Sequence, residues 1–181
     1  MKVNDILTKT AELLNLDTEI VAENSTDEKA RDLMIRALNN VISEIAEEYI
    51  PFIVENVVHP TDGFIPYSAL EKKVMKVISI RDEKDKKIFF KEKMHGITLK
   101  CGDKPCTVIY SYHPEEVGYG DEFIVPNCVS ERTISYGVAG EYALISERFE
   151  ECLNYDVRFN TAIAGDARRG KERKLPYRRY L

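Results

Sequence analysis

Tryptophan is absent from this chain of 181 residues, and histidine and cysteine are scarce, with three and four copies. Four cysteines are too few for the disulfide framework of a secreted protein, so we expect reduced thiols. Cys101 and Cys106 have four residues between them, whereas a zinc knuckle has two, and Cys128 and Cys152 stand alone. The sequence therefore predicts no bound metal and no other cofactor.

The short motifs of common enzymes are also missing. No nucleophile elbow, paired-histidine zinc motif or glycine-rich phosphate loop occurs in the sequence. His59 and His113 each precede a proline, and His95 precedes a glycine, so all three are expected in turns. No nucleophile motif accompanies them for which a histidine could act as general base. Adjacent acidic pairs do not converge on one point in a strand or a helix. We predict that the protein is not an enzyme.

Long apolar runs are lacking as well. No segment approaches the ~20 apolar residues that a membrane-spanning helix needs. The N-terminal "MKVNDILTKTAELL" carries acidic residues where a signal peptide would be apolar. We therefore expect no membrane association and synthesis in a cytosol-like compartment. The hydrophobic fraction of 44% is that of an ordinary globular protein.

Helical periodicity is present near the N-terminus. Apolar residues recur at helical spacing over about 3–15 and again over about 26–49. Ser25 and Glu28 form a capping box before the second helix, and Pro51 ends it. The sequence therefore predicts a short helix followed by a long one.

Two further helices are predicted after residue 126. Ser130 and Ser146 are placed to cap them. Gly137 and Gly140 lie inside the first of these helices, which indicates either close helix packing or a break. The four helices need one another to bury their apolar faces, so we expect a bundle. Its expected core consists of Leu33, Leu38, Val41, Ile42, Ile45, Phe149, Leu153 and Ile163.

Between the helices the pattern changes to short β-rich segments separated by turn residues. These segments are "FIVENVV", "KVMKVISI", "KKIFFKE", "GITLKC", "CTVIYSY" and "EFIV", and "IRDEKDKKI" is typical of a hairpin tip. The predicted fold class is α+β. A helical bundle, with two helices from 1–51 and two from 127–168, carries an inserted antiparallel β module, 52–126, and an extended basic tail, 169–181.

The tail contrasts in charge with the rest of the chain. From Arg168 to Leu181 there are seven basic residues and one acid, giving about +6, so the other residues sum to about −11 in a chain of net charge −5. Such a tail is a solubilising end, a phosphate-binding arm or a docking peptide. Interleaved apolar and aromatic anchors favour docking. The candidate docking residues are Arg173, Lys174, Leu175, Tyr177, Arg178, Arg179, Tyr180 and Leu181.

The order of elements resembles that of the head-tail connector proteins of tailed bacteriophages, which include adaptor, tail-tubular and gatekeeper proteins. The resemblance is carried by "YSYHPEEVGYGDEFIVPNCVSERTISYGVAGEYALISERFEECLNYDVRFNTAIAGDARRG". In it a Tyr and a Pro close the last long strand, and an acidic loop with "DE" precedes a hydrophobic-Pro pair. Two helices and a basic end follow.

The resemblance implies a structural virion protein in the phage neck, made in the bacterial host cytoplasm. Such connectors form closed rings, commonly of about twelve subunits, beneath the portal protein and above a downstream tail protein, with genomic DNA passing through the lumen. Their C-terminal segment often clasps the portal or a neighbouring subunit. The alternative that the residues leave open is a nucleic-acid-binding or regulatory module with a basic C-terminal arm.

Overall fold

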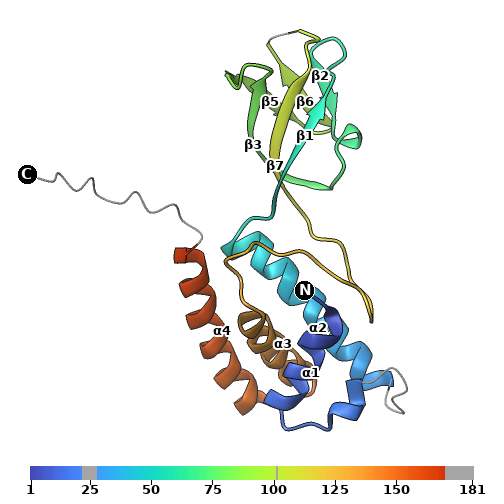
Figure 1. Cartoon of the computed structure of the whole chain (residues 1–181), viewed down its shortest axis with the longest axis vertical. Coiled ribbons are helices and arrows are strands. Elements are labelled where there is room, and N and C mark those ends of the chain that lie inside the picture. Colours follow the sequence, from blue (N-terminus) through green and yellow to red (C-terminus); the bar gives the residue numbers. More distant parts are fainter. Residues whose placement is uncertain (22–27, 101, 170–181) are drawn as a thin grey trace, which may run out of the picture. The chain divides into compact units, whose positions relative to one another are not determined.

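The computed structural model describes residues 1–21, 28–100 and 102–169 (Figure 1). In these ranges the chain is mixed α+β, with four α-helices and two antiparallel sheets. It divides into two compact units: a helical unit, Met1–Glu44 with Glu116–Leu181, and a β unit, Ile45–Glu115. The β unit thus begins and ends earlier than the predicted 52–126. Ser25 of the predicted capping box and Cys101 lie outside the described residues.

The helical unit is organised around α3. Its helices are α1 (Val3–Leu13), α2 (Glu28–Glu44), α3 (Glu131–Ile145) and α4 (Phe149–Arg169). α3 packs against each of the other three (Figure 1). A 3₁₀ turn (Thr18–Val21) follows α1. The four predicted helices are therefore confirmed as elements, although α2 ends at Glu44 and a π-helical turn (Ile45–Tyr49) continues it towards Pro51.

The two predicted serine caps have different outcomes. Ser130 caps α3, because its Oγ accepts a hydrogen bond from the backbone N–H of Thr133 at 3.2 Å. The prediction for Ser146 is wrong: it is the C-cap residue of α3, and α4 begins at Phe149. The connection between the two helices, residues 146–148, therefore lies later in the chain than the sequence pattern suggested. Glu147, in the left-handed region at φ 60°, turns the chain there.

The predicted core is buried in part. Leu38, Val41, Ile42, Ile45 and Ile163 are buried. Three assignments need correction: Leu33 is half-buried, at the edge of the α2 face, and Phe149 and Leu153 are exposed. These last two lie roughly a quarter to a third of a turn around α4 from the centre of its buried face. That face consists of Cys152, Tyr155, Phe159, Ile163 and Asp166.

The β unit holds two sheets. The four-stranded sheet has the order β1-β7-β3-β4, with β1 (Ile53–Val58), β7 (Cys106–Tyr112), β3 (Val74–Asp82) and β4 (Lys87–Ile88). The three-stranded sheet has the order β2-β6-β5, with β2 (Phe64–Pro66), β6 (Gly96–Leu99) and β5 (Phe90–Lys93). A 3₁₀ turn (Tyr67–Ala69) follows β2. All strand pairings are antiparallel.

The predicted hairpin tip is confirmed, because β3 and β4 pair through Ile80 with Ile88 and Arg81 with Lys87. The predicted single strand "KKIFFKE" is instead two strands, β4 and β5, which belong to different sheets and are separated by Phe89. This residue is therefore the point where the chain passes from one sheet to the other.

The prediction of a strand at "EFIV" is wrong. Only Glu122 forms an isolated bridge, with Lys2, and the segment belongs to the helical unit. Phe123 donates its backbone N–H to the carbonyl of Met1, and its own carbonyl accepts from the N-terminal amino group. The segment is thus extended because it is held to the N-terminus, which is the reason the predicted module boundary was too late.

Candidate docking surface on the helical unit

The predicted docking residues, Arg173 to Leu181, lie outside the described residues. The structure does describe the last turn of α4, to which this segment is joined. Arg168 and Arg169, the first basic residues of the tail as predicted, belong to α4. The geometry of that turn therefore determines where the tail begins.

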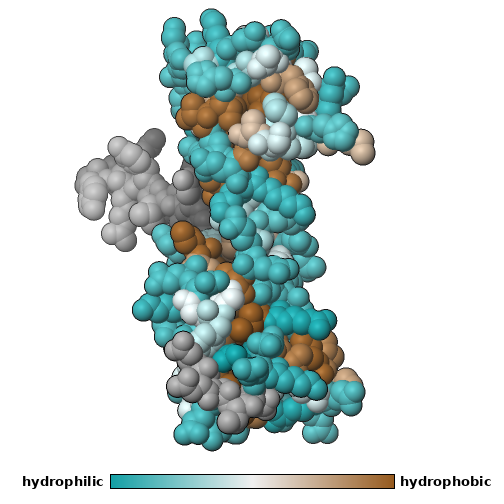
Figure 2. All heavy atoms as spheres, turned by 90° about the vertical axis from the view of Figure 1, so that its right-hand side faces the viewer, coloured by the Kyte–Doolittle hydropathy of each residue, from teal (hydrophilic) through white to brown (hydrophobic). Residues whose placement is uncertain are grey.

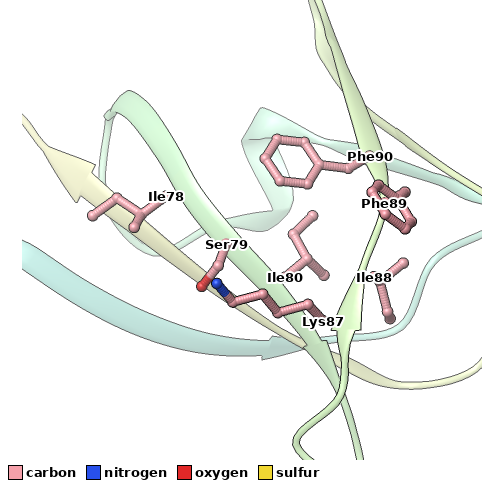
Figure 3. Close-up of a pocket in the computed structure, with 7 residues that line it drawn as sticks. All are labelled: Ile78, Ser79, Ile80, Lys87, Ile88, Phe89 and Phe90. Atoms are coloured by element: carbon pink, nitrogen blue, oxygen red, sulfur yellow. The ribbon is translucent and has the colours of Figure 1, made fainter.

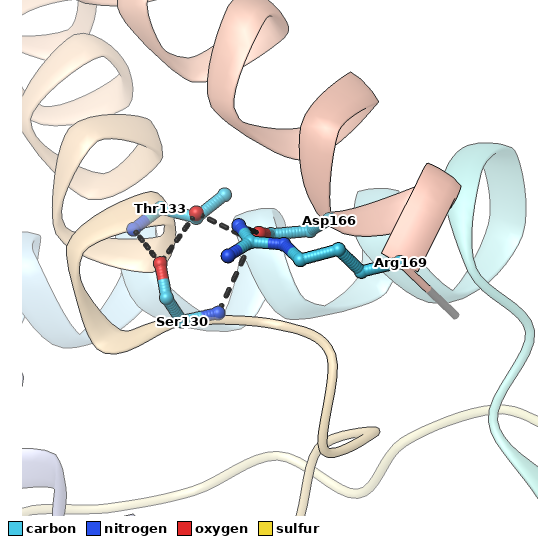
Figure 4. Close-up of polar contacts among 4 residues, drawn as sticks. All are labelled: Ser130, Thr133, Asp166 and Arg169. Carbon is cyan, nitrogen blue, oxygen red and sulfur yellow. Dashed lines mark hydrogen bonds and ion pairs between the residues drawn. The ribbon is translucent and has the colours of Figure 1, made fainter.

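Asp166, in the last turn of α4, is hydrogen-bonded to residues at the start of α3 (Figure 4). Its side chain is fully buried. Its Oδ2 accepts hydrogen bonds from the hydroxyl of Thr133 at 2.6 Å and from the backbone N–H of Ser130 at 3.1 Å. Its Oδ1 accepts from the guanidinium of Arg169. A buried carboxylate is tolerated only with such partners, so these contacts fix the position of the helix end.

Two arginines lie over tyrosine rings between α3 and α4. The guanidinium carbon of Arg132 is 5.2 Å from the centre of the Tyr136 ring, and that of Arg158 is 5.9 Å from it and 5.4 Å from the Tyr155 ring. Tyr155 donates its hydroxyl hydrogen to the carbonyl of Leu13, and burial raises the pKa of this phenol. These contacts hold α1, α3 and α4 together and leave both arginines facing solvent.

The exposed apolar residues of α4 form a second face of that helix. Phe149, Leu153 and Val157 are 61%, 68% and 68% exposed, and their spacing of four places them on one side. We call these three residues the α4 stripe. Sequence reasoning assigned Phe149 and Leu153 to the core, because α4 carries two apolar series and the sequence does not show which of them packs against α3.

Three features of the described residues bear on chemistry. In residues 1–21, 28–100 and 102–169, no group of three or more His, Cys, Asp or Glu could hold a metal ion. Nδ1 of His113 and Oε1 of Glu47 lie 3.5 Å apart in the β unit. Burial and then the charge of Asp156 raise the pKa of the Cys152 thiol, which disfavours the reactive thiolate.

The face of the molecule drawn in Figure 2 is mostly hydrophilic, with hydrophobic residues gathered in patches. Over the part of the chain that the structure describes, every helix is too short or too polar to cross a bilayer. Patches of exposed apolar residues rimmed by polar ones mark sites of protein contact. The α4 stripe, on the first half of the helix whose last turn Asp166 anchors, is therefore the candidate docking surface.

Comparison of the chain with models of known protein families and with curated proteins finds no match to either.

Proposed function

We propose that this chain is a structural virion protein of a tailed bacteriophage, which forms a ring in the neck that connects the portal to the tail and lets DNA pass. In this proposal the four helices form a bundle with the β unit inserted into it. The basic tail is a docking segment for the portal or for a neighbouring subunit. The partners are further copies of the chain, the portal protein, a downstream tail protein and the DNA in the lumen.

The observation that carries the proposal is the α4 stripe. Phe149, Leu153 and Val157 would leave a large apolar face in water if the chain acted alone. A second copy of the chain is the occupant that we infer, because a ring repeats one interface between every pair of neighbours. The acidic residues that flank the stripe, Glu150 and Asp156, suit the polar rim of such an interface.

The anchored end of α4 supports the docking role of the tail. Because Asp166 binds the last turn to Ser130 and Thr133, the tail starts from a fixed point of each subunit. A segment that orders on its partner loses less binding energy when its attachment point is already fixed. The proposal therefore combines a rigid helix end with a basic, aromatic peptide.

The charge balance supports passage of DNA. Without the fourteen C-terminal residues, the chain carries about −11, and a lumen lined by carboxylates repels phosphates. The tail, at about +6, has the opposite sign and suits an acidic surface on a partner. If the part of the chain outside the tail bound DNA, that part would be expected to be basic and not acidic.

The ring is tested by negative-stain microscopy and sedimentation of the full chain, alone and with phage heads that carry portal but lack this protein. We expect rings with the wild type and their loss in the double variant Leu153→Glu, Val157→Glu, with an unchanged circular dichroism spectrum. The control is the double variant Val57→Glu, Met94→Glu, which introduces the same two charges at exposed apolar residues of the β unit. Wild-type protein that neither forms rings nor joins heads would contradict the proposal.

The tail is tested separately. Deletion of residues 170–181 should leave the fold intact and abolish attachment to heads, and replacement of Tyr177, Tyr180 and Leu181 by Ala should do much of the same damage. A DNA mobility assay at two salt concentrations examines the alternative function. If Arg178→Ala with Arg179→Ala abolishes DNA binding while heads are joined normally, the basic arm is a nucleic-acid contact and the docking role is wrong.

A further inference from the structure

One edge of β3 lacks a partner strand over most of its length. β7 pairs with β3 from Val74 to Asp82, whereas β4, on the opposite side, pairs only with Ile80 and Arg81. No strand in the described ranges borders residues 74–79 on that side. β5 is likewise the last strand of its own sheet. Backbone N–H and C=O groups on such edges are available to a further strand.

An apolar pocket of about 270 Å³ opens beside this edge (Figure 3). Ile78, Ser79 and Ile80 line it from β3, and residues 87–90 line it from β4, from the start of β5 and from Phe89 between these two strands. A register shift between Val77 and Ser79 places an extra residue, Ile78, at this point of the strand. Such bulges redirect a side chain, and Ile78 is 46% exposed. Phe89, at the passage between the sheets, is 84% exposed.

The segment of the chain that carries the pocket is basic in sequence. From Lys72 to Lys93 the sequence holds nine Lys or Arg residues and four acidic residues, within a chain of net charge −5. Lys87 itself lines the pocket, with its amine directed towards Ser79 (Figure 3). An occupant of this site would therefore combine apolar side chains with acidic ones.

We propose that the open edge of β3 and the pocket beside it bind an extended peptide strand from a partner protein, with apolar side chains alternating with acidic ones. The strand adds its backbone to β3, places its apolar side chains against Ile78 and Phe89, and directs its carboxylates to the surrounding lysines. A nucleic acid has no row of backbone N–H and C=O groups to pair with a β edge, so a peptide fits both features of the site.

The probe is a fluorescently labelled peptide of about nine residues that alternates Glu and Val, with both ends blocked. We expect it to bind the full chain, measured by anisotropy, and to slow hydrogen exchange of the β3 amides. Two further versions carry N-methyl groups at odd or at even positions, which removes the backbone donors of one edge at a time. At least one of them should bind at least about tenfold more weakly.

Matched variants locate the site. Phe89→Ala and Lys87→Glu should each weaken binding by about tenfold or more, whereas Met94→Ala and Lys104→Glu, at exposed residues outside the pocket, should not. Absence of binding to the wild type would overturn the proposal, as would binding of both N-methylated peptides as tight as that of the unmethylated peptide. Equal affinity for a peptide alternating Lys and Val would overturn the acidic assignment. Stronger competition by a single-stranded oligonucleotide than by unlabelled peptide would assign the site to nucleic acid instead.

Discussion

Gly137 of α3 lies where both α2 and α4 pack closely against α3: a Cβ atom built on it would be 2.8 Å from Cγ1 of Val41 and 3.0 Å from Cδ2 of Phe159. Real Cβ atoms do not come so close to their neighbours. Of the two expectations for this glycine, close packing and a broken helix, the structure shows the first, since α3 continues through it from Glu131 to Ile145. The small residue is therefore a packing requirement.

Replacing Gly137 by Ala should lower the free energy of unfolding by about 1–3 kcal/mol, because overpacking outweighs the gain in helix propensity of up to about 1 kcal/mol. Gly140→Ala is the matched control. Its nearest neighbour is the carboxylate of Asp156, the movable end of an exposed side chain, so the stability should stay equal or rise by up to about 1 kcal/mol. Urea unfolding measures both; equal loss in the two variants would contradict the packing argument.

Leu38→Ala and Ile42→Ala should each cost about 2–5 kcal/mol, because both side chains are buried in the middle of α2 and truncation leaves a cavity. Leu153→Ala removes a similar side chain from the exposed face of α4 and should change the stability by less than about 0.5 kcal/mol. Chemical unfolding at a concentration that keeps the chain monomeric separates the two cases. Unchanged urea midpoints for both α2 variants would show that their face is not core.

Asp166→Ala should destabilise the helical unit by about 1.5–3 kcal/mol, because the Thr133 hydroxyl and the Ser130 N–H lose a charged acceptor in a buried setting. The control is Asp156→Ala, on the same helix. It changes the helix propensity by the same amount, because it is the same substitution, but at an exposed position. A double-mutant cycle with Thr133→Val, by urea unfolding, should give a positive coupling energy. A coupling energy of zero would mean that the hydrogen bond contributes nothing to the anchor.

The ion pair between Lys9 of α1 and Glu131 of α3 should make the free energy of unfolding depend on pH. The hydrogen bond from Lys9, and then its charge, lower the pKa of the Glu131 carboxyl below the value of 4.5 that it has when unfolded. The contribution of this ion pair to the free energy of unfolding is therefore complete above about pH 4.5. It is lost as the pH falls through the lower pKa that Glu131 has in the folded protein.

Glu131→Gln should consequently flatten the decline in stability of the wild type below about pH 4.5, and Glu12→Gln, at an exposed carboxylate of α1, should leave it unchanged. Both members of the pair are more than a third exposed, so solvent screening limits the effect to less than about 1 kcal/mol. Unfolding curves at several pH values test this. An unaltered slope in the Gln variant would show that the pair is too solvated to matter.

Periodicity and turn chemistry were sufficient to predict the helices and most of the strands. The long apolar series of α2, the Ser130 cap and the charged tip between Arg81 and Lys87 are local features, and each is present as predicted. They could be read from the sequence because the interactions that form them span only a few neighbouring residues. The predictions that failed depend on contacts between distant residues.

α4 shows why part of the candidate site was missed. Its apolar residues form two series, and only packing against α3 decides that Phe159 and Ile163 are buried while Leu153 is exposed. The strand predicted at "EFIV" failed for a related reason, since its backbone partner is Met1, far away in the sequence. β2 was not predicted, because its three residues include a proline, which is uncommon within strands.

The pairing of β1 with β7 has a consequence for chain entropy. The β unit interrupts the helical unit, yet its first and last strands are antiparallel neighbours, with Ile53 opposite Ser111 and Tyr112 bonded to the carbonyl of Phe52. Paired residues have Cα atoms about 4.5–5.5 Å apart. Once the β unit has folded, its two ends are therefore held close together, as in a short closed loop. The conformational entropy lost in joining α2 to α3 is then nearly independent of the number of residues in the β unit.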